Sequence, residues 1–309
     1  MTSRKPILIT GSHRSGSTWV GKMIAEAPSV FYIHEPFNVS HPPKPGVSSA
    51  KFKYWFTYVN RENEANFYKR IKNTIELRYD LVNALISIRS KKDIEVLKQQ
   101  YGEFFKHRLQ GSKPLIKDPL ALFSSEWLAE RFNMDVVVLI RHPAAFVSSI
   151  KKKDWTFPFS HFLEQPLLLE THLYPFEAEI REYAANNHDI VDQGILLWRI
   201  IHYMIIQYEK KHKDWLFVRH EDLSRNPLQE FQNLFNKLDL EFTEHVREVI
   251  KEYSSSTNSN EAVDGEGFFK RNSELNIWNW KDRLTPLEIE KIRNQVEDIS
   301  SVFYSNRDW

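Results

Sequence analysis

The fold is decided by the stretch Ile7-Leu-Ile-Thr-Gly11-Ser-His-Arg14-Ser-Gly16-Ser-Thr18-Trp-Val-Gly-Lys-Met-Ile. A short apolar run ends in a glycine-containing turn, and a helical pattern of apolar residues follows at once. The first backbone N–H groups of a helix have no partners within it, and the helix dipole places positive charge at the same end. The stretch therefore predicts a phosphate-binding loop between a buried strand and a helix.

The two glycines have the spacing of the P-loop motif G-x-x-x-x-G-K-[ST] of nucleotide-hydrolysing enzymes. Ser17 stands where that motif has the lysine that grips a triphosphate, and the strong cation is instead Arg14, inside the loop. We therefore expect Arg14 and the backbone amides of Ser15, Gly16, Ser17 and Thr18 to hold a phosphate without ATP hydrolysis. The alternative is a tight strand-to-helix connection that binds nothing.

A second segment, Met134-Asp-Val-Val-Val-Leu-Ile-Arg141-His-Pro143-Ala-Ala-Phe-Val-Ser-Ser149, predicts another anion site. The unbroken β-branched run is typical of a strand that is buried on both faces. It ends in Arg141, and Pro143 then suits the first turn of a helix. Ser149 follows about two helical turns later, so its hydroxyl returns toward the guanidinium. Arginine with serine is a suitable clamp for a second phosphate.

Two phosphate sites on neighbouring strand tips indicate a nucleotide that is phosphorylated at two positions. The pair resembles the 5′-phosphosulfate loop and the 3′-phosphate motif of sulfotransferases that use 3′-phosphoadenosine 5′-phosphosulfate (PAPS). Both the R-S-G-S-T sequence and the spacing from Arg141 to Ser149 agree. The pattern is most similar to the carbohydrate type. Further similar segments follow in the family's order: Val30-Phe-Tyr-Ile-His-Glu35-Pro-Phe, Leu216-Phe-Val-Arg-His-Glu221-Asp222-Leu and Trp280-Lys-Asp-Arg283-Leu-Thr-Pro.

Composition is compatible with a soluble enzyme. The 309 residues carry a formal charge of +1, which gives no overall attraction to nucleic acid or to an anionic membrane. No apolar run approaches the roughly 18–20 residues of a membrane span, and no signal peptide precedes the first strand. Cysteine is absent, which excludes disulfides, thiolate catalysis and cysteine zinc sites. We expect a cytoplasmic enzyme that binds no nucleic acid and has no membrane span, and the oligomeric state stays open.

Alternating strand and helix patterns predict an α/β protein with a P-loop, in which helices flank both faces of a parallel sheet. We expect one sulfotransferase domain over residues 1–309, with helical insertions at about 38–110 and 154–187. Both insertions follow the carboxyl ends of strands, where ligands bind in open sheets, and we expect them to form the acceptor pocket. The predicted strands are 6–10, 29–34, 114–117, 134–141 and 215–219. The predicted helices are 18–26, 124–132, 144–151, 190–211, 227–238 and 286–303.

For catalysis the resemblance implies that Lys117, at a strand end, faces the sulfuryl group and that Arg14 neutralises the departing nucleotide. Aryl sulfotransferases follow that lysine with threonine and the catalytic histidine, but this chain has Asp118 and Pro119. We therefore choose Glu35 as the base, as in carbohydrate-type enzymes, and expect its apolar neighbours to raise its pKa. His34, His41 and Asp118 are rival bases. The alternative role of Glu35 is a structural ion pair with Arg14 or Lys117.

The resemblance also implies that Trp19, Arg271 and Asn272 contact the nucleotide, the last two from a basic loop that reaches the 3′-phosphate. The alternative for this loop is a solvated basic turn. No metal is expected, and the resemblance implies that PAPS is the donor. The sequence thus predicts transfer of a sulfuryl group from PAPS to a hydroxyl, with release of 3′-phosphoadenosine 5′-phosphate (PAP). A carbohydrate or glycolipid acceptor is expected. The alternatives are a P-loop kinase of a small metabolite and an inactive protein that binds PAP.

Overall fold

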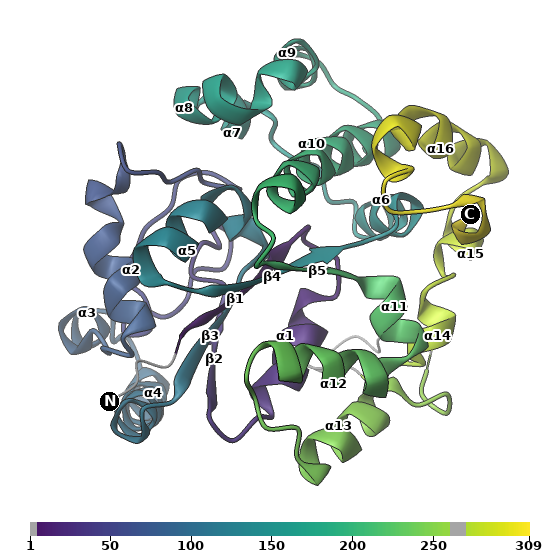
Figure 1. Ribbon diagram of the computed structural model, residues 1–309. Coiled ribbons are helices and arrows are strands. Elements are labelled where there is room, and N and C mark those ends of the chain that lie inside the picture. The colour runs from purple at the N-terminus through teal and green to yellow at the C-terminus, as the bar shows by residue number, and fades with distance from the viewer. Residues whose placement is uncertain (1–4, 260–269) are drawn as a thin grey trace.

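A five-stranded parallel sheet forms the centre of the computed structural model, which describes residues 5–259 and 270–309 (Figure 1). The strands lie in the order β2-β3-β1-β4-β5, so the chain crosses over between non-neighbouring strands. Each predicted strand is confirmed within one residue at either end. The strands are β1 (Ile7–Gly11), β2 (Val30–His34), β3 (Lys113–Lys117), β4 (Asp135–Ile140) and β5 (Leu216–Arg219).

Helices cover both faces of the sheet, because alternate strand side chains point to opposite sides. Leu8 and Val138 pack into the larger core and Ile7 and Val137 into the smaller one. The larger core is covered by α5 (Ser125–Phe132), α6 (Pro143–Lys152), α10 (Ile190–Lys211) and α16 (Pro286–Ser300). The smaller core is covered by α1 (Ser17–Ala25), α12 (Pro227–Lys237) and α13 (Glu244–Ser254). The predicted fold class is therefore confirmed.

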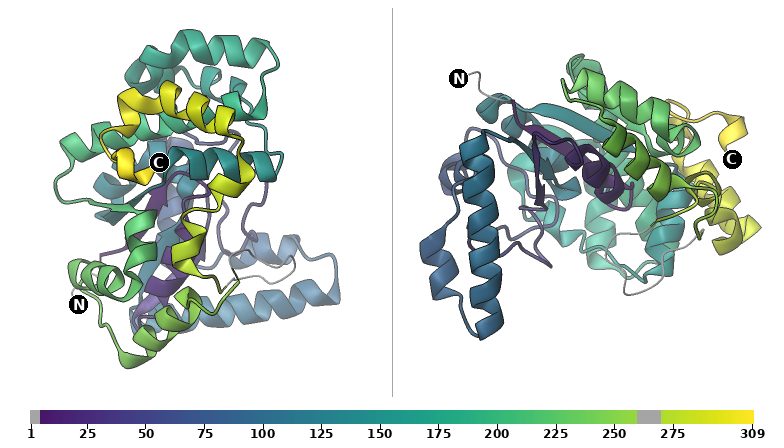
Figure 2. Two further views of the ribbon diagram at one scale, coloured as in Figure 1. Left: turned by 90° about the vertical axis from the view of Figure 1, so that its right-hand side faces the viewer. Right: turned by 90° about the horizontal axis from the view of Figure 1, so that it is seen from below.

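The two predicted insertions are helical. The first contains η1 (Glu64–Asn66), α2 (Tyr68–Ile75), α3 (Leu81–Ile86) and α4 (Lys91–Gln110). The second contains α7 (Ser160–Leu163), α8 (Pro166–Leu168), η3 (Leu169–Leu173), η4 (Tyr174–Phe176) and α9 (Glu177–Ala185). It follows helix α6 instead of following a strand directly. Helix α4 stands at the margin of the molecule (Figure 2), and Phe104 is its one buried side chain.

The remaining helices were not predicted. They are α13 and five shorter helices: η2 (Pro119–Ser124), α11 (His220–Arg225), α14 (Ser273–Asn276), α15 (Trp280–Arg283) and η5 (Asn306–Asp308). All except α13 are too short for a periodic apolar pattern. Within the described ranges, no helix is long and apolar enough to cross a membrane.

Candidate active site

The loop between β1 and α1 has the conformation of an anion-binding turn. Gly16 caps α1 in the left-handed region, with φ of 84°, and Arg14 also has a positive φ, 62°. A Cβ atom on Gly16 would lie 2.5 Å from Nδ1 of His220. Both the backbone conformation and the close approach of His220 therefore require glycine here. Helix α1 begins directly after this loop, so the N–H groups of its first turn lie at the loop, as the sequence predicted.

Several buried polar atoms around the loop have no hydrogen-bond partner within the described residues. They are the Oγ atoms of Ser12 and Ser15, Nε1 of Trp19 and Nε of Arg141. A buried polar group without a partner costs about 1–3 kcal/mol, and native proteins leave few of them. These atoms belong to the loop, to α1 and to the residue after β4, and an oxygen-rich ligand at the loop would supply the partners they lack.

The loop is joined to the predicted second clamp. Nε of Arg14 donates a hydrogen bond of 2.8 Å to Oγ of Ser149 on α6. Nη1 of Arg141, at the end of β4, donates to the carbonyl of Arg14 at 3.1 Å. The indole of Trp198 donates to the Arg141 carbonyl at 2.9 Å and fixes that backbone. The structure thus brings the predicted residues Arg14, Arg141 and Ser149 together.

Four guanidinium groups lie close enough to influence one another. The surrounding protein lowers the pKa of Arg14, although part of the side chain is exposed, and the charges of Arg271 and Arg283 lower it further. Burial lowers the pKa of Arg141 to about 10; Glu221 opposes that shift, while Arg14 and Arg271 add to it. Like charges that converge from four separate segments favour a polyanionic ligand.

Arg283 was not among the predicted site residues. It ends α15, which packs on α6, the helix that carries Ser149. The ring of Trp280, on α15, stacks on His142 with 5.2 Å between centroids and anchors this helix beside the clamp. The available signal was the segment from Trp280 to Arg283, which is similar to a segment of the family but was not assigned a role in the site.

Asn272 follows Arg271 in the chain, but its side chain already makes two hydrogen bonds within the protein. Its Oδ1 accepts from the backbone N–H of Leu275 at 3.1 Å and caps α14. Its Nδ2 donates to the carbonyl of Ser256 at 3.0 Å. A nucleotide contact of Asn272 stays a prediction, and the side chain would have to leave these partners to make it.

Glu35 and Lys117 form an ion pair at the ends of β2 and β3. Lys117 is fully buried, and Asn38 also donates from its amide to Glu35. Burial acts to raise the pKa of Glu35, but the charge and hydrogen bond of Lys117 outweigh it and hold that pKa below its usual value. The expected rise was therefore wrong, because β2 and β3 pair in parallel and bring the two side chains together.

The rival bases have different surroundings. Asp118 is fully buried, and its carboxylate accepts from the N–H groups of Phe37 at 2.6 Å and Leu120 at 3.0 Å. Burial and the charge of Glu35 raise the pKa of Asp118 to about 8. His34 is exposed, with Nε2 3.9 Å from Glu35 Oε2. His41 is exposed and donates its backbone N–H to Asn38 at 2.8 Å.

His13, which the sequence did not single out, marks the point where both insertions meet the loop. Its ring lies among Trp55 and Phe56 of the first insertion and Trp155 of the second, at centroid distances of 6.1, 5.7 and 5.3 Å. Trp55 and Trp155 contact each other at 5.2 Å. Burial lowers the pKa of His13 to about 3, so the imidazole is neutral near pH 7. An acceptor pocket at this junction stays a prediction.

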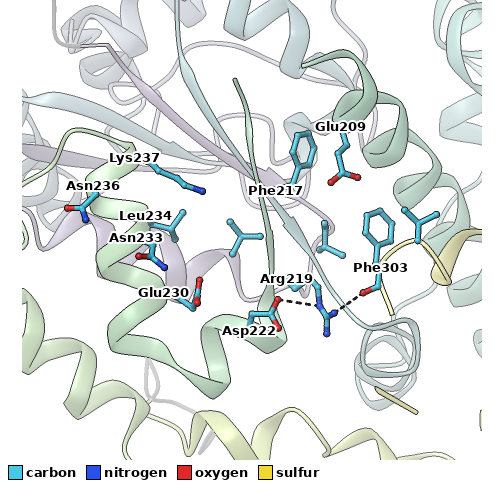
Figure 3. Close-up of a pocket in the computed structure, with 13 residues that line it drawn as sticks. Glu209, Phe217, Arg219, Asp222, Glu230, Asn233, Leu234, Asn236, Lys237 and Phe303 are labelled. Atoms are coloured by element: carbon cyan, nitrogen blue, oxygen red, sulfur yellow. Dashed lines mark hydrogen bonds and ion pairs between the residues drawn. The ribbon is translucent and has the colours of Figure 1, made fainter. Parts of the chain in front are cut away.

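A cavity of about 510 Å³ lies elsewhere, beside β5 and α12 (Figure 3). Within it Arg219 donates to the carbonyl of Phe303 at 2.8 Å and pairs with Asp222 at 3.5 Å. None of its lining residues belongs to the loop or to the insertions. In the part of the chain that the structure describes, no cluster of three or more histidine, cysteine or acidic residues could hold a metal ion.

The sheet order and the loop define an α/β protein of the P-loop class. Residues 6–244 match the family model described as the sulfotransferase family, and the chain belongs to this family. Its members transfer sulfuryl groups. A comparison of this chain with curated proteins found no match.

Solved structures with a similar fold are sulfotransferases of low sequence identity. The sulfotransferase domain of the Synechococcus PCC 7002 olefin synthase is 15% identical, with 96% of this chain and 97% of that chain covered and a TM-score of 0.44. The mouse sulfotransferase SULT7A1, solved in complex with PAP, is 12% identical, with 99% and 87% covered and a TM-score of 0.46.

Proposed function

We propose that the protein transfers the sulfuryl group of PAPS to a hydroxyl of a carbohydrate or glycolipid acceptor and releases PAP. The observation that carries the proposal is the contact of Arg14 with both Ser149 and Arg141. It joins a phosphate-binding loop to a second anion clamp, as a nucleotide with 5′ and 3′ phosphates requires. The unpartnered buried atoms around the loop support the same reading.

In the proposed reaction the acceptor oxygen attacks sulfur in line with the leaving 5′-phosphate. A new S–O bond forms to the acceptor, and the S–O bond to the bridging phosphate oxygen breaks, with its electron pair left on that oxygen. Arg14 and the amides of Ser15 to Thr18 stabilise the growing charge. The hydroxyl proton passes to the Glu35 carboxylate. The products are the sulfate ester and PAP.

Glu35 is preferred to its rivals on geometry. Both Asp118 oxygens already accept backbone N–H groups, so Asp118 is better suited to fix the turn after β2. His34 is exposed, its Nε2 lies 3.9 Å from Glu35 Oε2, and its Nδ1 lies 3.0 Å from the hydroxyl of Tyr32. Glu35 combines a side chain that is partly open to solvent with direct contact to Lys117.

A kinase of a small metabolite is the competing function. It requires a lysine at the position of Ser17 and an acidic residue for magnesium after an apolar strand, but β4 ends before Arg141. The deciding experiment compares PAP and ATP with magnesium in thermal melts and calorimetry, followed by transfer from labelled PAPS to an acceptor panel. We expect PAP to bind at micromolar concentration or tighter and to raise the melting temperature, with little effect of ATP. Equal stabilisation by both would contradict the proposal.

A further inference from the structure

Lys117 lies between the sheet and α1, and its ammonium contacts Glu35. It ends β3, and its Cα pairs in register with Ile9, two residues before Gly11. Its stem packs on α1, where a Cβ atom on Gly21 would lie 3.0 Å from Lys117 Cγ. Glycine at this position therefore lets the lysine lie between the sheet and the helix that follows the phosphate-binding loop. The ammonium reaches Glu35 from there.

The two members of this ion pair differ in how firmly they are held. Glu35 has a left-handed backbone, with φ of 41°, and its N–H donates to the Lys117 carbonyl at 2.9 Å. The N–H of Asn38 donates to the Glu35 carbonyl at 3.1 Å, and the Asn38 amide binds the carboxylate. The stem of Lys117 is buried and packed, but its terminal ammonium has three donors that turn about the last bond of the side chain. The ammonium is thus the member that can change partners.

An ammonium that is buried in protein is costly unless an anion faces it. Among the described residues, Glu35 is the acceptor that the Lys117 ammonium contacts. A carboxylate held in such a pair is a weak proton acceptor, because protonation would leave the ammonium without its counter-charge. A base in this pair therefore needs a replacement anion for Lys117 before it can accept a proton.

We propose that the sulfuryl group of the bound donor is this replacement: it competes with Glu35 for the Lys117 ammonium and releases Glu35 to act as the base. The inference rests on the proposed function. Binding of the donor then also frees the Glu35 carboxylate to accept a proton. The acceptor hydroxyl is therefore deprotonated only when the sulfuryl group is present. PAP has no sulfuryl group and leaves the ion pair intact.

The test is the ratio of the dissociation constants of PAP and PAPS, measured by calorimetry on the full-length protein. Glu35→Gln removes the carboxylate that competes for Lys117, so the affinity for PAPS should rise by about 10-fold, which is the scale of one hydrogen bond to a charged group. The affinity for PAP should change by less than about two-fold. Lys117→Met should abolish the preference for PAPS over PAP. The matched controls are Lys5→Met and Asp135→Asn, which break another lysine–carboxylate pair, of 2.7 Å, and should change neither constant.

An unchanged or reduced PAPS preference in Glu35→Gln would overturn the inference, because the ion pair would then be permanent. If Glu35→Gln does not fold, Glu35→Asp retains the charge but shortens the reach to Lys117. It should then raise the PAPS preference in the same direction by a smaller factor, and no rise would again contradict the exchange. Failure of the wild-type protein to bind PAP is a separate result that overturns the proposed function itself.

Discussion

Arg14 and Ser149 are 135 residues apart in the chain, and a hydrogen bond of 2.8 Å joins their side chains. One belongs to the loop after β1 and the other to the helix after β4, and β1 and β4 are neighbouring strands. A ligand phosphate at either position therefore contacts a residue that is already linked to the other. We therefore expect the two proposed anion sites to act as one extended site, and the first predictions concern it.

Arg141→Ala should weaken PAP binding by about 1.5–3 kcal/mol, the usual range for a hydrogen bond to a charged group. The side chain is buried, and its Nε has no partner among the residues that the structure describes. Calorimetry checks the affinity and a thermal melt checks folding. A folded variant with wild-type affinity would place the 3′-phosphate elsewhere.

Arg14→Ala should weaken donor binding and slow transfer, because negative charge grows on the bridging oxygen in the transition state. Arg14→Lys should retain part of both. Steady-state kinetics with PAPS varied separates the two effects. If lysine performs no better than alanine, then the bidentate geometry of the guanidinium matters more than its charge.

Glu35→Gln should reduce transfer to an alkyl hydroxyl by about 10²–10⁴-fold, the contribution of a positioned base. Phenolic acceptors ionise more readily and should lose less. Single-turnover rates with both acceptor types provide the measurement, and melting curves verify the fold. Nearly full turnover of the variant would remove Glu35 from the mechanism and favour His34, His41 or Asp118.

Gly16→Ala should destabilise the protein by about 1–3 kcal/mol, because alanine is strained in the left-handed region. The added Cβ would also press on His220, and donor affinity should fall. Gly102→Ala is the matched control: this glycine lies in α4 with no atom within 4 Å of an added Cβ. Urea unfolding of both variants compares them, and an equal effect would show that the loop tolerates a side chain.

The protein should lose stability as the pH falls from about 6.5 toward 3. Burial lowers the pKa of each of His13, His142 and His202 to about 3. Below pH 6.5 the unfolded chain therefore binds protons that the folded chain does not, and the free energy of unfolding decreases.

His202→Phe tests this pH dependence, since a phenyl ring preserves the stacking on Trp198 at 4.0 Å. Between pH 6 and pH 4 the slope of the unfolding free energy should fall by about 1.4 kcal/mol per pH unit, the value of one proton. Urea unfolding at several pH values measures it. A slope equal to that of the wild type would mean that His202 titrates alike in both states.

The sheet was predictable because its strands are short apolar runs with clear ends. The run before Arg141 gives β4, and Pro143 opens α6 where proline suits the first helical turn. Other features depend on neighbours in space. The pKa of Glu35 is set by Lys117 on the adjacent strand, and the placement of Arg283 by the packing of α15 on α6. No local pattern contains that information.

His13, within the phosphate-binding loop motif, is another residue whose surroundings could not be predicted from the local sequence. The loop sequence identifies the backbone turn and Arg14, but the environment of His13 is made by aromatic rings from both insertions. Helix α13 is a different case, because its apolar positions, among them Val246 and Ile250, and its Thr243 cap were visible in the sequence.

The four neighbouring arginines have a practical consequence for anyone who handles the protein. The charges of Arg271 and Arg283 lower the pKa of Arg14, so a small oxyanion that binds beside these arginines is favoured by their combined positive charge. Ligands that bind only the native state raise its stability by mass action. We therefore expect phosphate or sulfate buffers to stabilise the protein while weakening its apparent affinity for nucleotide. Binding constants should be compared only in buffers whose anions bind poorly, such as chloride at matched ionic strength.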